Sequence, residues 1–418
     1  MSQTSVRNID RLPLIGFSRD HNLAKRLVLK LFSGIKVGRL TVHDQGEVFT
    51  LGTDTATSAP QAEVTIHNPR TYWRILTGGT VASGEAYIDG DWSSDNLTEV
   101  TRLFSANMAT MEAMADKQSW LTQLLLKLAH FGRRNNKEGS KANISAHYDL
   151  GNDFFQLFLD RTMMYSSAVF PTDSADLDTA SLHKLDLICQ ALELKAEDRL
   201  IEIGTGWGGM ALYAAEQYGC HVTTTTISQE QYQHTLDLVK ARGLEDRITV
   251  LTQDYRDLEG QFDKLVSIEM IEAVGHEYYE SYFKTLSQLL KPEGKAVIQA
   301  ITITDQRYES ARRSVDFIKR YIFPGGCLPS INIISENIAA HTDLQMAGLR
   351  DITLDYAKTL EAWHQRFLAK LDQVHAMGFD ERFVRMWRFY LSYCEGGFRE
   401  RIIGTYQITM TKPGYRQG

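Results

Sequence analysis

The stretch RLIEIGTGWGGMALYAAEQYG, residues 199–219, decides the fold of this chain. A short apolar run leads into the turn GTGWGG (204–209), which can be read as G-x-G-x-x-G, and a helical pattern follows. In a strand–turn–helix unit of this kind, glycines let the backbone approach a ligand and the helix N-terminus offers free N–H groups. The turn alone is a weak signal, because any tight strand-to-helix turn favours glycine. Its neighbours must therefore decide whether it holds a cofactor, and which one.

Strand and helix patterns alternate from this stretch onward. Apolar and β-branched runs (RLIEIG, CHVTTTTIS, RITVLTQ, DKLVSIE and GKAVIQAITIT) are separated by segments with a helical period. Such alternation predicts right-handed crossovers and a doubly wound, mostly parallel sheet. LRDITLDY (349–356) and TYQITMTKP (405–413) are predicted as terminal strands, around two helices near 358–377 and 380–400.

The N-terminal third has a different pattern. Short alternating runs with glycine-rich breaks over residues 32–92 predict a small β-rich module, followed by helices that include the leucine-rich stretch 119–131. The charged run RRNNKEGSKANIS (133–145) is typical of an exposed linker. We therefore expect a smaller α+β domain over 1–132, a linker over 133–145 and an α/β domain over 146–418.

Composition excludes several classes of protein. A net charge of −7 over 418 residues argues against a nucleic-acid-binding protein. The four cysteines form no C-x-x-C motif and no cluster with histidine, so we expect no metal site and no disulfide framework, as in a reducing cytoplasm. No run of 18 or more apolar residues, the length that a membrane-spanning helix needs, occurs, and the N-terminus lacks the pattern of a secretory signal.

Three acidic positions indicate the cofactor. A nicotinamide-dinucleotide site usually has an acid about 20 residues beyond the glycines, at the end of the second strand. Here that place is VTTTTIS, with no acid before Glu230. Glu202 stands two residues before the first glycine and Asp254 follows the third strand, which resembles the first motifs of methyltransferases that use S-adenosylmethionine. The pattern favours S-adenosylmethionine over NAD.

Four longer stretches carry a more specific resemblance. GTVASGEAYIDGDWSSDNL (79–97), ISAHYDLGNDFFQLFLDRTMMYSSAVF (144–170), VSIEMIEAVGHEYYESYF (266–283) and YIFPGGCLPS (321–330) together resemble the cyclopropane-fatty-acyl-phospholipid synthase family. The resemblance spans about residues 30–412. It implies a Rossmann-like class I methyltransferase domain with a lid inserted at 305–335, and a small N-terminal domain that presents lipid.

The resemblance also implies an activity. Family members transfer a methyl(ene) carbon from S-adenosylmethionine to the cis double bond of an unsaturated acyl chain in a membrane phospholipid. We therefore expect a cytoplasmic enzyme, peripheral on the inner face of the cell membrane, and a homodimer is left open. Two basic stretches, 127–137 and 306–326, are candidates for contact with anionic headgroups. The residues that the resemblance implies for S-adenosylmethionine are Tyr165, Ser166, Glu202, Gly204, Gly206, Trp207, Gly208, Thr226, Ile227, Gln231, Asp254 and Tyr255.

The same resemblance implies a base that ends the reaction. In the family this base is a bicarbonate, held by a Cys, a Glu, a His, a Tyr and a backbone carbonyl. Glu272 and Tyr356 match the glutamate and the tyrosine, and Ile301 offers the carbonyl, but Ser167 stands at the cysteine position and Gln299 at the histidine position. Serine and glutamine still donate hydrogen bonds to an oxyanion, although the most basic ligand is missing.

These replacements leave three outcomes open. The first is a cyclopropane product, formed when the base takes a proton from the newly added methyl group. The second is the same methyl transfer with a different proton loss, which gives a methylene- or methyl-branched chain. The third is a non-catalytic relative that binds lipid or cofactor. A methyltransferase for small molecules or headgroups is a further alternative, against which the family resemblance stands.

Overall fold

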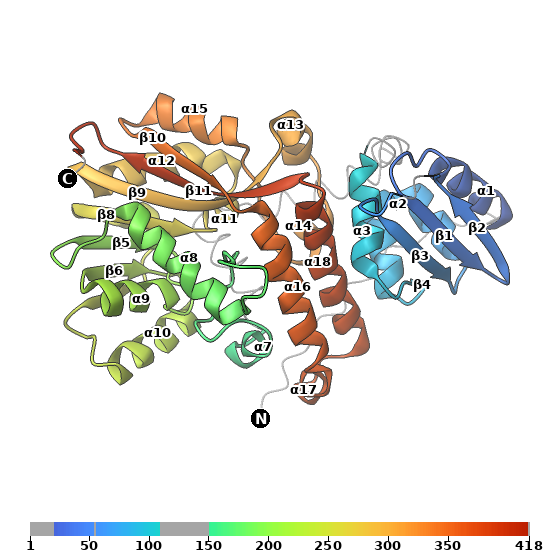
Figure 1. Cartoon of the computed structure of the whole chain (residues 1–418), viewed down its shortest axis with the longest axis horizontal. Helices are drawn as coiled ribbons and strands as arrows, with labels where there is room; N and C mark the ends of the chain where they lie inside the picture. The colour runs from blue at the N-terminus through green and yellow to red at the C-terminus, as the bar shows by residue number, and fades with distance from the viewer. Residues whose placement is uncertain (1–20, 54–55, 109–149, 417–418) are drawn as a thin grey trace.

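The computed structural model describes residues 21–53, 56–108 and 150–416. Figure 1 shows a larger part around a seven-stranded sheet and a smaller N-terminal part around a four-stranded sheet, with the helices α16 (Thr353–Leu368) and α18 (Glu381–Arg399) between the two sheets. The predicted linker 133–145 and the leucine-rich stretch 119–131 lie outside the described residues. The predicted domain limits therefore remain predictions.

The seven-stranded sheet has the strand order β10-β11-β9-β8-β5-β6-β7. Strands β5 to β9 pair in parallel, whereas β10 and β11 are antiparallel. The doubly wound, mostly parallel sheet that was predicted is confirmed. Its strands are β5 (Arg199–Ile203), β6 (His221–Thr225), β7 (Ile248–Leu251), β8 (Phe262–Ile268), β9 (Leu290–Ile303), β10 (Gln345–Asp351) and β11 (Ile403–Thr411).

Both faces of this sheet are covered by helices, which explains why its central strands are apolar throughout. Successive side chains of a strand point to opposite faces. In β5, Leu200 packs with the helices on one face, while Ile201 and Ile203 pack with those on the other. The first face is covered by α8 (Leu177–Leu192), α9 (Gly209–Tyr218) and α10 (Gln229–Ala241), and the second by α12 (Tyr279–Leu289) and α15 (Ile331–His341) (Figure 1).

The predicted lid stretch, 305–335, contains two helices and the start of α15. These two helices are α13 (Asp305–Arg313) and α14 (Phe317–Tyr321). The remaining short elements are α7 (Asn152–Gln156), α11 (Ile271–Val274), α17 (Leu371–Ala376) and the 3-10 turns η1 (Tyr255–Asp257) and η2 (His276–Tyr278). None of the described helices is long and apolar enough to cross a membrane.

The small part has the strand order β2-β1-β3-β4, and its last predicted β segment is largely helical. Helix α2 occupies Arg70–Ile88, so the prediction of β structure over 79–88 was wrong. The glycines there serve the packing instead: a Cβ at Gly84 would lie 2.9 Å from the Phe389 ring. The elements are α1 (His21–Phe32), β1 (Arg39–Asp44), β2 (Glu47–Leu51), β3 (Gln61–Ile66), α2, β4 (Trp92–Ser93) and α3 (Leu97–Ala106).

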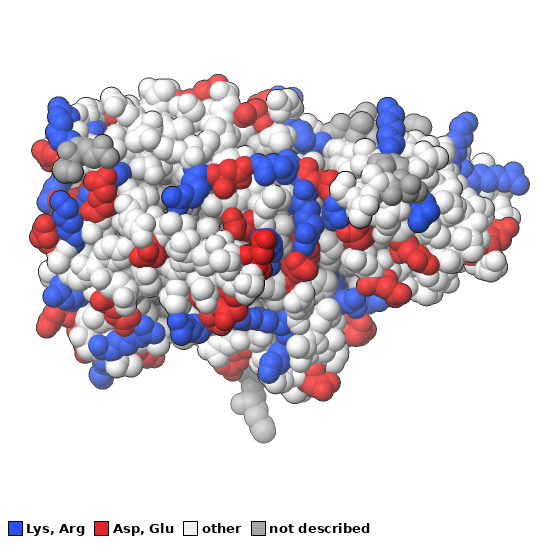
Figure 2. All heavy atoms as spheres, viewed as in Figure 1, with Lys and Arg blue, Asp and Glu red and all other residues white. Residues whose placement is uncertain are grey.

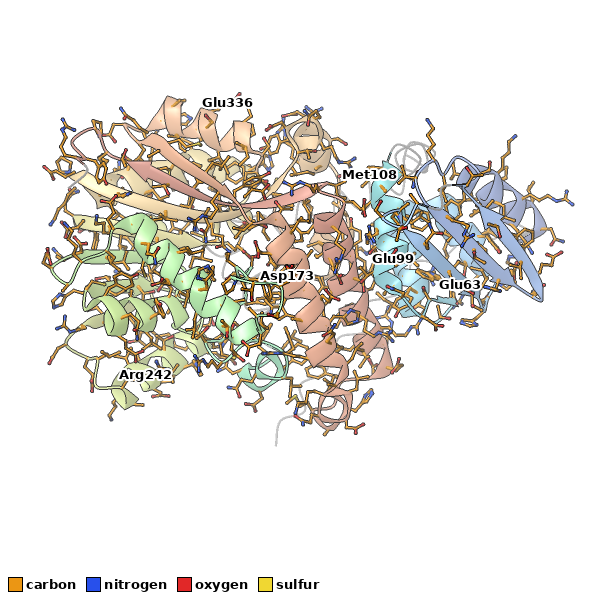
Figure 3. All side chains as sticks on the ribbon, viewed as in Figure 1. Glu63, Glu99, Met108, Asp173, Arg242 and Glu336 are labelled. Carbon is orange, nitrogen blue, oxygen red and sulfur yellow. The ribbon has the colours of Figure 1, made fainter. Side chains whose placement is uncertain are left out.

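A second correction concerns residues 353–356, which were predicted as the end of a strand. Strand β10 ends at Asp351, whose carboxylate accepts the backbone N–H of Thr353 at 2.9 Å and so starts α16. Tyr356 therefore lies in the first turn of α16. Asp173, labelled in Figure 3 beside this helix, forms an ion pair with Lys358.

Helix α18 joins the two parts. Thr98 of α3 donates a hydrogen bond to Glu395 at 2.9 Å, and Arg102 pairs with Glu400 at 2.8 Å. On the other side of α3, Glu99, labelled in Figure 3, accepts the backbone N–H of Gln61 in β3. One apolar cluster continues from α1 and β1 through α16 and α18 as far as Trp207. The two sheets are thus connected by a shared core.

Candidate active site

The glycine turn between β5 and α9 combines an open position with a packed one. Gly204, Gly206 and Gly208 all have positive φ, at 101°, 52° and 87°. A Cβ at Gly206 would meet nothing within 4 Å, whereas one at Gly208 would lie 2.8 Å from the Thr235 side chain. Gly206 therefore leaves room for a ligand, and Gly208 allows the close approach of α10. This open turn, at the carboxyl end of a central parallel strand, fits S-adenosylmethionine.

Hydrogen bonds of Glu202, just before the glycine turn, and of Trp207, within it, hold these two side chains in place. Glu202 is 3% exposed and accepts a hydrogen bond from Thr224 at 2.7 Å. Burial raises the pKa of Glu202 to about 8. The indole N–H of Trp207 donates to Asn152 at 2.7 Å. A direct contact of Glu202 with the cofactor remains a prediction.

The residues expected at the methionine end are held by partners from distant elements. The Tyr165 hydroxyl lies 2.8 Å from that of Tyr390, in α18. Ser166 accepts a hydrogen bond from the ammonium of Lys184 at 2.8 Å. Lys184 is completely buried, and burial lowers its pKa to about 8. The negative charges of Glu269, Asp160 and Glu202 raise this pKa, but by less than burial lowers it. The sequence analysis did not single out this lysine.

The residues expected at the ribose and adenine mostly bond to one another. Thr226 donates to Gln231 at 2.9 Å, and Ile227 beside it is partly exposed. Asp254 caps η1 and forms an ion pair with Arg256 at 2.6 Å. The ring of Tyr255 packs edge-on against Tyr282. These positions surround the carboxyl ends of β6 and β7, but their contacts with the cofactor remain predictions.

The polar groups predicted to hold an oxyanion do come together, and a carboxylate of the chain lies among them. Glu269 follows β8 directly, and its Oε1 accepts the backbone N–H of Ser167 at 2.9 Å and the amide of Gln299 at 2.8 Å. The Tyr356 hydroxyl donates to Oε2 at 2.7 Å. Three residues that were expected to hold bicarbonate therefore donate to Glu269, Ser167 through its backbone N–H, while its hydroxyl donates to the carbonyl of Ala168 at 2.8 Å. A separately bound bicarbonate does not fit this arrangement.

Glu272, the predicted catalytic glutamate, lies beside this cluster. One of its oxygens accepts the backbone N–H of Ile301, while the other is buried without a hydrogen-bond partner. Burial, reinforced by the charge of Glu269, raises the pKa of Glu272 to about 8. The N–H of Ile301 thus contacts one of the site's carboxylates, and the role expected of its carbonyl remains a prediction.

Glu269 is the residue that the sequence analysis missed. The available signal was its position: an acid directly after the apolar run KLVSI, at the carboxyl end of a parallel strand, where ligands of such sheets bind. The side chain of Met270, next to it, lies 3.5 Å from where a Cβ of Gly204 would stand. The carboxylate cluster and the glycine turn are therefore neighbours.

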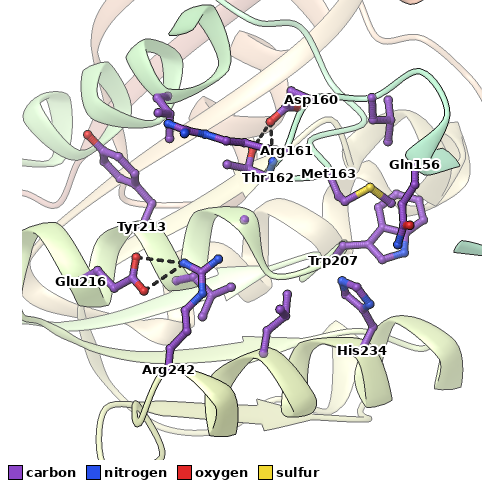
Figure 4. Close-up of a pocket in the computed structure, with 15 residues that line it drawn as sticks. Gln156, Asp160, Arg161, Thr162, Met163, Trp207, Tyr213, Glu216, His234 and Arg242 are labelled. Carbon is purple, nitrogen blue, oxygen red and sulfur yellow. Dashed lines mark hydrogen bonds and ion pairs between the residues drawn. The ribbon is translucent and has the colours of Figure 1, made fainter. Parts of the chain in front are cut away.

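A surface cavity of about 290 Å³ opens beside Trp207 and Gly209, on one side of the glycine turn (Figure 4). It is lined by Trp207, by Arg161 and by residues of α9 and α10, including the ion pair between Glu216 and Arg242 at 2.9 Å. Gly204, Gly206 and Glu269 are not among its lining residues. We therefore place the chemistry at the carboxylate cluster and not in this cavity.

The fold and the glycine turn define the class of the protein, a class I methyltransferase that uses S-adenosylmethionine. A solved mycolic acid cyclopropane synthase, CmaA1, complexed with SAH and CTAB, is similar with a TM-score of 0.61 and 32% identity over 65% of this chain and 98% of that chain. The chain belongs to the mycolic acid cyclopropane synthetase family, whose model matches residues 135–408.

Two curated relatives are similar over most of their length. The tuberculostearic acid methyltransferase UfaA1 of Mycobacterium tuberculosis is 37% identical over 376 residues, 88% of this chain and 87% of the relative. The cyclopropane-fatty-acyl-phospholipid synthase of Escherichia coli is 37% identical over 359 residues, 85% of this chain and 89% of the relative. The resemblance found in the sequence is confirmed, and the protein is a methyltransferase of this type that modifies acyl chains.

Proposed function

We propose that the enzyme transfers a methyl carbon to the cis double bond of an unsaturated acyl chain in a membrane phospholipid. The observation that carries the proposal is an aromatic wall next to the two carboxylates. Tyr356 stacks on Phe398 with ring centroids 4.5 Å apart, and Tyr165 packs on Trp363 at 5.3 Å. An alkene is a weak nucleophile whose attack leaves a carbocation, and aromatic faces and carboxylates stabilise positive charge in a dry site.

Each group of the site then has a defined task. When bound, S-adenosylmethionine supplies an electrophilic methyl group. The open backbone at Gly206 admits it, and the aromatic wall excludes water from the acyl chain. Glu269 places its carboxylate beside the carbon that becomes positive, and Glu272 places there an oxygen that has no other hydrogen-bond partner. Metal assistance is not needed for these steps, and the described residues contain no cluster of side chains suited to a metal ion.

The first product that we propose is a cyclopropane. Loss of a proton from the added methyl group closes the ring, because the electrons of the broken C–H bond form the new C–C bond. A second candidate is a branched chain. A hydride shift moves the positive charge to the carbon that bears the new methyl group, and loss of a methyl proton from this rearranged cation leaves a methylene branch. Two observations support this second product. Ser167 and Gln299 replace Cys and His, and a relative from Mycobacterium tuberculosis is named a tuberculostearic acid methyltransferase.

Contact with the membrane surface is part of the proposal. Helix α1 exposes Leu23, Arg26, Leu27 and Lys30, spaced so that they form one stripe. Leu23 is 49% exposed and Leu27 45% exposed. Figure 2 shows Lys and Arg side chains at this end of the molecule. An apolar stripe flanked by cations suits an anionic bilayer surface, which supports a peripheral position on the inner face of the cell membrane.

The test is expression in a bacterial host that lacks such enzymes. Fatty esters of the host's phospholipids are separated by chromatography and examined by NMR, because a cyclopropane and a methylene branch have the same mass. We expect a new acyl species one CH₂ heavier than the parent unsaturated chain, absent with the Gly206→Val variant. Unchanged acyl chains, together with methylation of soluble amines or headgroups by the purified enzyme, would overturn the proposal.

A further inference from the structure

We infer that Glu269 is the general base of the reaction, so that the protein uses its own carboxylate where a bound bicarbonate would otherwise be required. The inference rests on the proposed function and names the group that takes the proton in the last step of that reaction. Glu269 was not among the predicted site residues, and it occupies the position that the oxyanion was expected to hold.

The hydrogen bonds of Glu269 orient it for this task. An ionised carboxylate has about four acceptor sites. Ser167 and Gln299 occupy two of them on Oε1, and Tyr356 occupies one on Oε2. One acceptor position on Oε2 is left for a proton from the substrate. The donors come from three separate segments, the loop before α8, strand β9 and helix α16, so the carboxylate is held from three sides.

The backbone at Glu269 supports a functional role. Its φ is 49°, in the left-handed region that costs a non-glycine residue free energy. Its N–H donates to the carbonyl of Gln299 at 2.7 Å, which holds this conformation. A residue kept in such a region by its surroundings is typical of functional sites. The next residue, Met270, places its side chain 3.5 Å from where a Cβ of Gly204 would stand, so this strained position lies beside the glycine turn.

The charged groups around Glu269 tune its basicity. Burial raises the pKa of Glu269, while the three hydrogen bonds and the buried Lys184 lower it. Glu272, beside it, has a pKa raised to about 8 and so stays largely protonated at neutral pH. Three hydrogen bonds favour the ionised form of Glu269, whereas one oxygen of Glu272 has no hydrogen-bond partner. A carboxylate made more basic by burial is suited to take a proton from carbon.

The step balances without a co-reactant. After methyl transfer the acyl chain carries one positive charge. Glu269 Oε2 takes a proton from the added methyl group, the C–H electron pair becomes the C–C bond that closes the ring, and the chain is neutral again. If a hydride shift precedes, the same pair becomes the C=C bond of the methylene branch. The proton leaves Glu269 for water when the product departs.

The inference is tested with three variants, Glu269→Gln, Glu269→Gly and Glu272→Gln, each assayed with and without bicarbonate in the buffer. The enzyme is assayed with labelled S-adenosylmethionine and vesicles of an unsaturated phospholipid, with carbon dioxide removed or bicarbonate added. The wild type should keep its turnover without bicarbonate. Glu269→Gln should keep cofactor affinity by calorimetry but lose about 10²–10⁴-fold in kcat, the usual contribution of a general base.

Glu269→Gly provides a matched control, because glycine accepts the positive φ and leaves the three donors free for an external anion. Its turnover should be lost in the same buffer and recover at least tenfold with added bicarbonate or formate. Glu272→Gln should show no such recovery, because Glu269 still occupies the donors.

Two results would overturn the inference alone: wild-type turnover that depends on bicarbonate, or Glu269 variants within threefold of the wild type. Absence of label in the phospholipid with wild-type enzyme, with and without bicarbonate, would instead overturn the proposed function, and the inference with it.

Discussion

At the scale of single residues, Gly206 and Gly208 share a positive φ but differ in their surroundings. A side chain at Gly208 would collide with Thr235, whereas the space at Gly206 is empty of protein. A substitution at Gly208 would therefore act on folding, and one at Gly206 on ligand binding. The two glycines show that one motif combines a packing requirement with a binding requirement.

Gly206→Val should abolish binding of S-adenosylmethionine while the protein still folds. A left-handed backbone costs an ordinary residue about 1–2 kcal/mol. Gly243→Val is the matched control, because Gly243 has φ 65°, also meets nothing within 4 Å, and lies beyond α10 away from the turn. Both variants should lose similar thermal stability, but only Gly206→Val should lose cofactor affinity in calorimetry. Normal affinity would refute the role of the turn.

Glu272→Gln should reduce turnover with little change in cofactor affinity, and it should also change how stability depends on pH. The folded-state pKa of about 8 lies above the ordinary 4.5, so between these values the unfolded chain releases a proton that the folded chain keeps. The wild type therefore loses stability as pH rises from about 4.5 to 8, by up to about 1.4 kcal/mol per pKa unit.

The glutamine variant lacks this loss. In urea unfolding, the free energy of unfolding of the variant should rise relative to that of the wild type between pH 5 and pH 8, with no difference at pH 4. A constant difference across this range would mean that Glu272 titrates normally in the folded protein.

At the scale of elements, the packing of α18 on α3 depends on a glycine. A Cβ at Gly396 would lie 2.4 Å from the Thr101 hydroxyl and 2.9 Å from the backbone N of Arg102. At the neighbouring Gly397, the closest atoms belong to the flexible side chain of Ile403, at 3.1 Å. The two glycines lie on one helix, but only the first faces the rigid backbone of α3.

Gly396→Ala should therefore destabilise the protein, by about 1–3 kcal/mol as is usual for overpacking. Gly397→Ala is the matched control, since both gain about 1 kcal/mol in helix propensity from the same substitution. Thermal unfolding should place Gly397→Ala near or above the wild type and Gly396→Ala clearly below it. Equal melting temperatures would show that α3 can move away from α18 without cost.

At the scale of the whole molecule, α18 and the lid stretch both attach the N-terminal part to the methyltransferase part. Helix α18 binds α3, and the lid stretch binds α2, where Tyr321 donates a hydrogen bond to Glu85 at 2.5 Å. Movement of the small part relative to the site is therefore linked to the lid. The exposed stripe of α1 lies on the part that we expect to present lipid.

The double variant Leu23→Glu/Leu27→Glu should bind anionic vesicles less tightly, because it removes apolar area and adds repulsion from anionic headgroups. Leu349→Glu, at an equally exposed leucine on β10, is the control. Co-sedimentation with phosphatidylglycerol vesicles should show at least tenfold weaker binding for the double variant alone. Similar binding of both variants would remove α1 from the membrane contact.

The prediction from sequence was accurate where short-range patterns determine structure. The parallel strands, the glycine turn and the helices after it follow from local periodicity, and the structure has them where they were predicted. It was wrong at 79–88 and at Tyr356, where glycine and β-branched residues suggested strands. Packing of α2 against α18, and the cap at Asp351, decided these segments.

What the sequence by itself determined is the sheet, the family and the cofactor class, because strand order, glycine spacing and motif context are all written along the chain. What only the tertiary structure decided is which carboxylate lies among Ser167, Gln299 and Tyr356. Those donors are separated from Glu269 by 30 or more residues along the chain, and their convergence is a consequence of folding. The physical reason is that hydrogen bonds to a buried carboxylate depend on distances in space, which the spacing of residues does not contain.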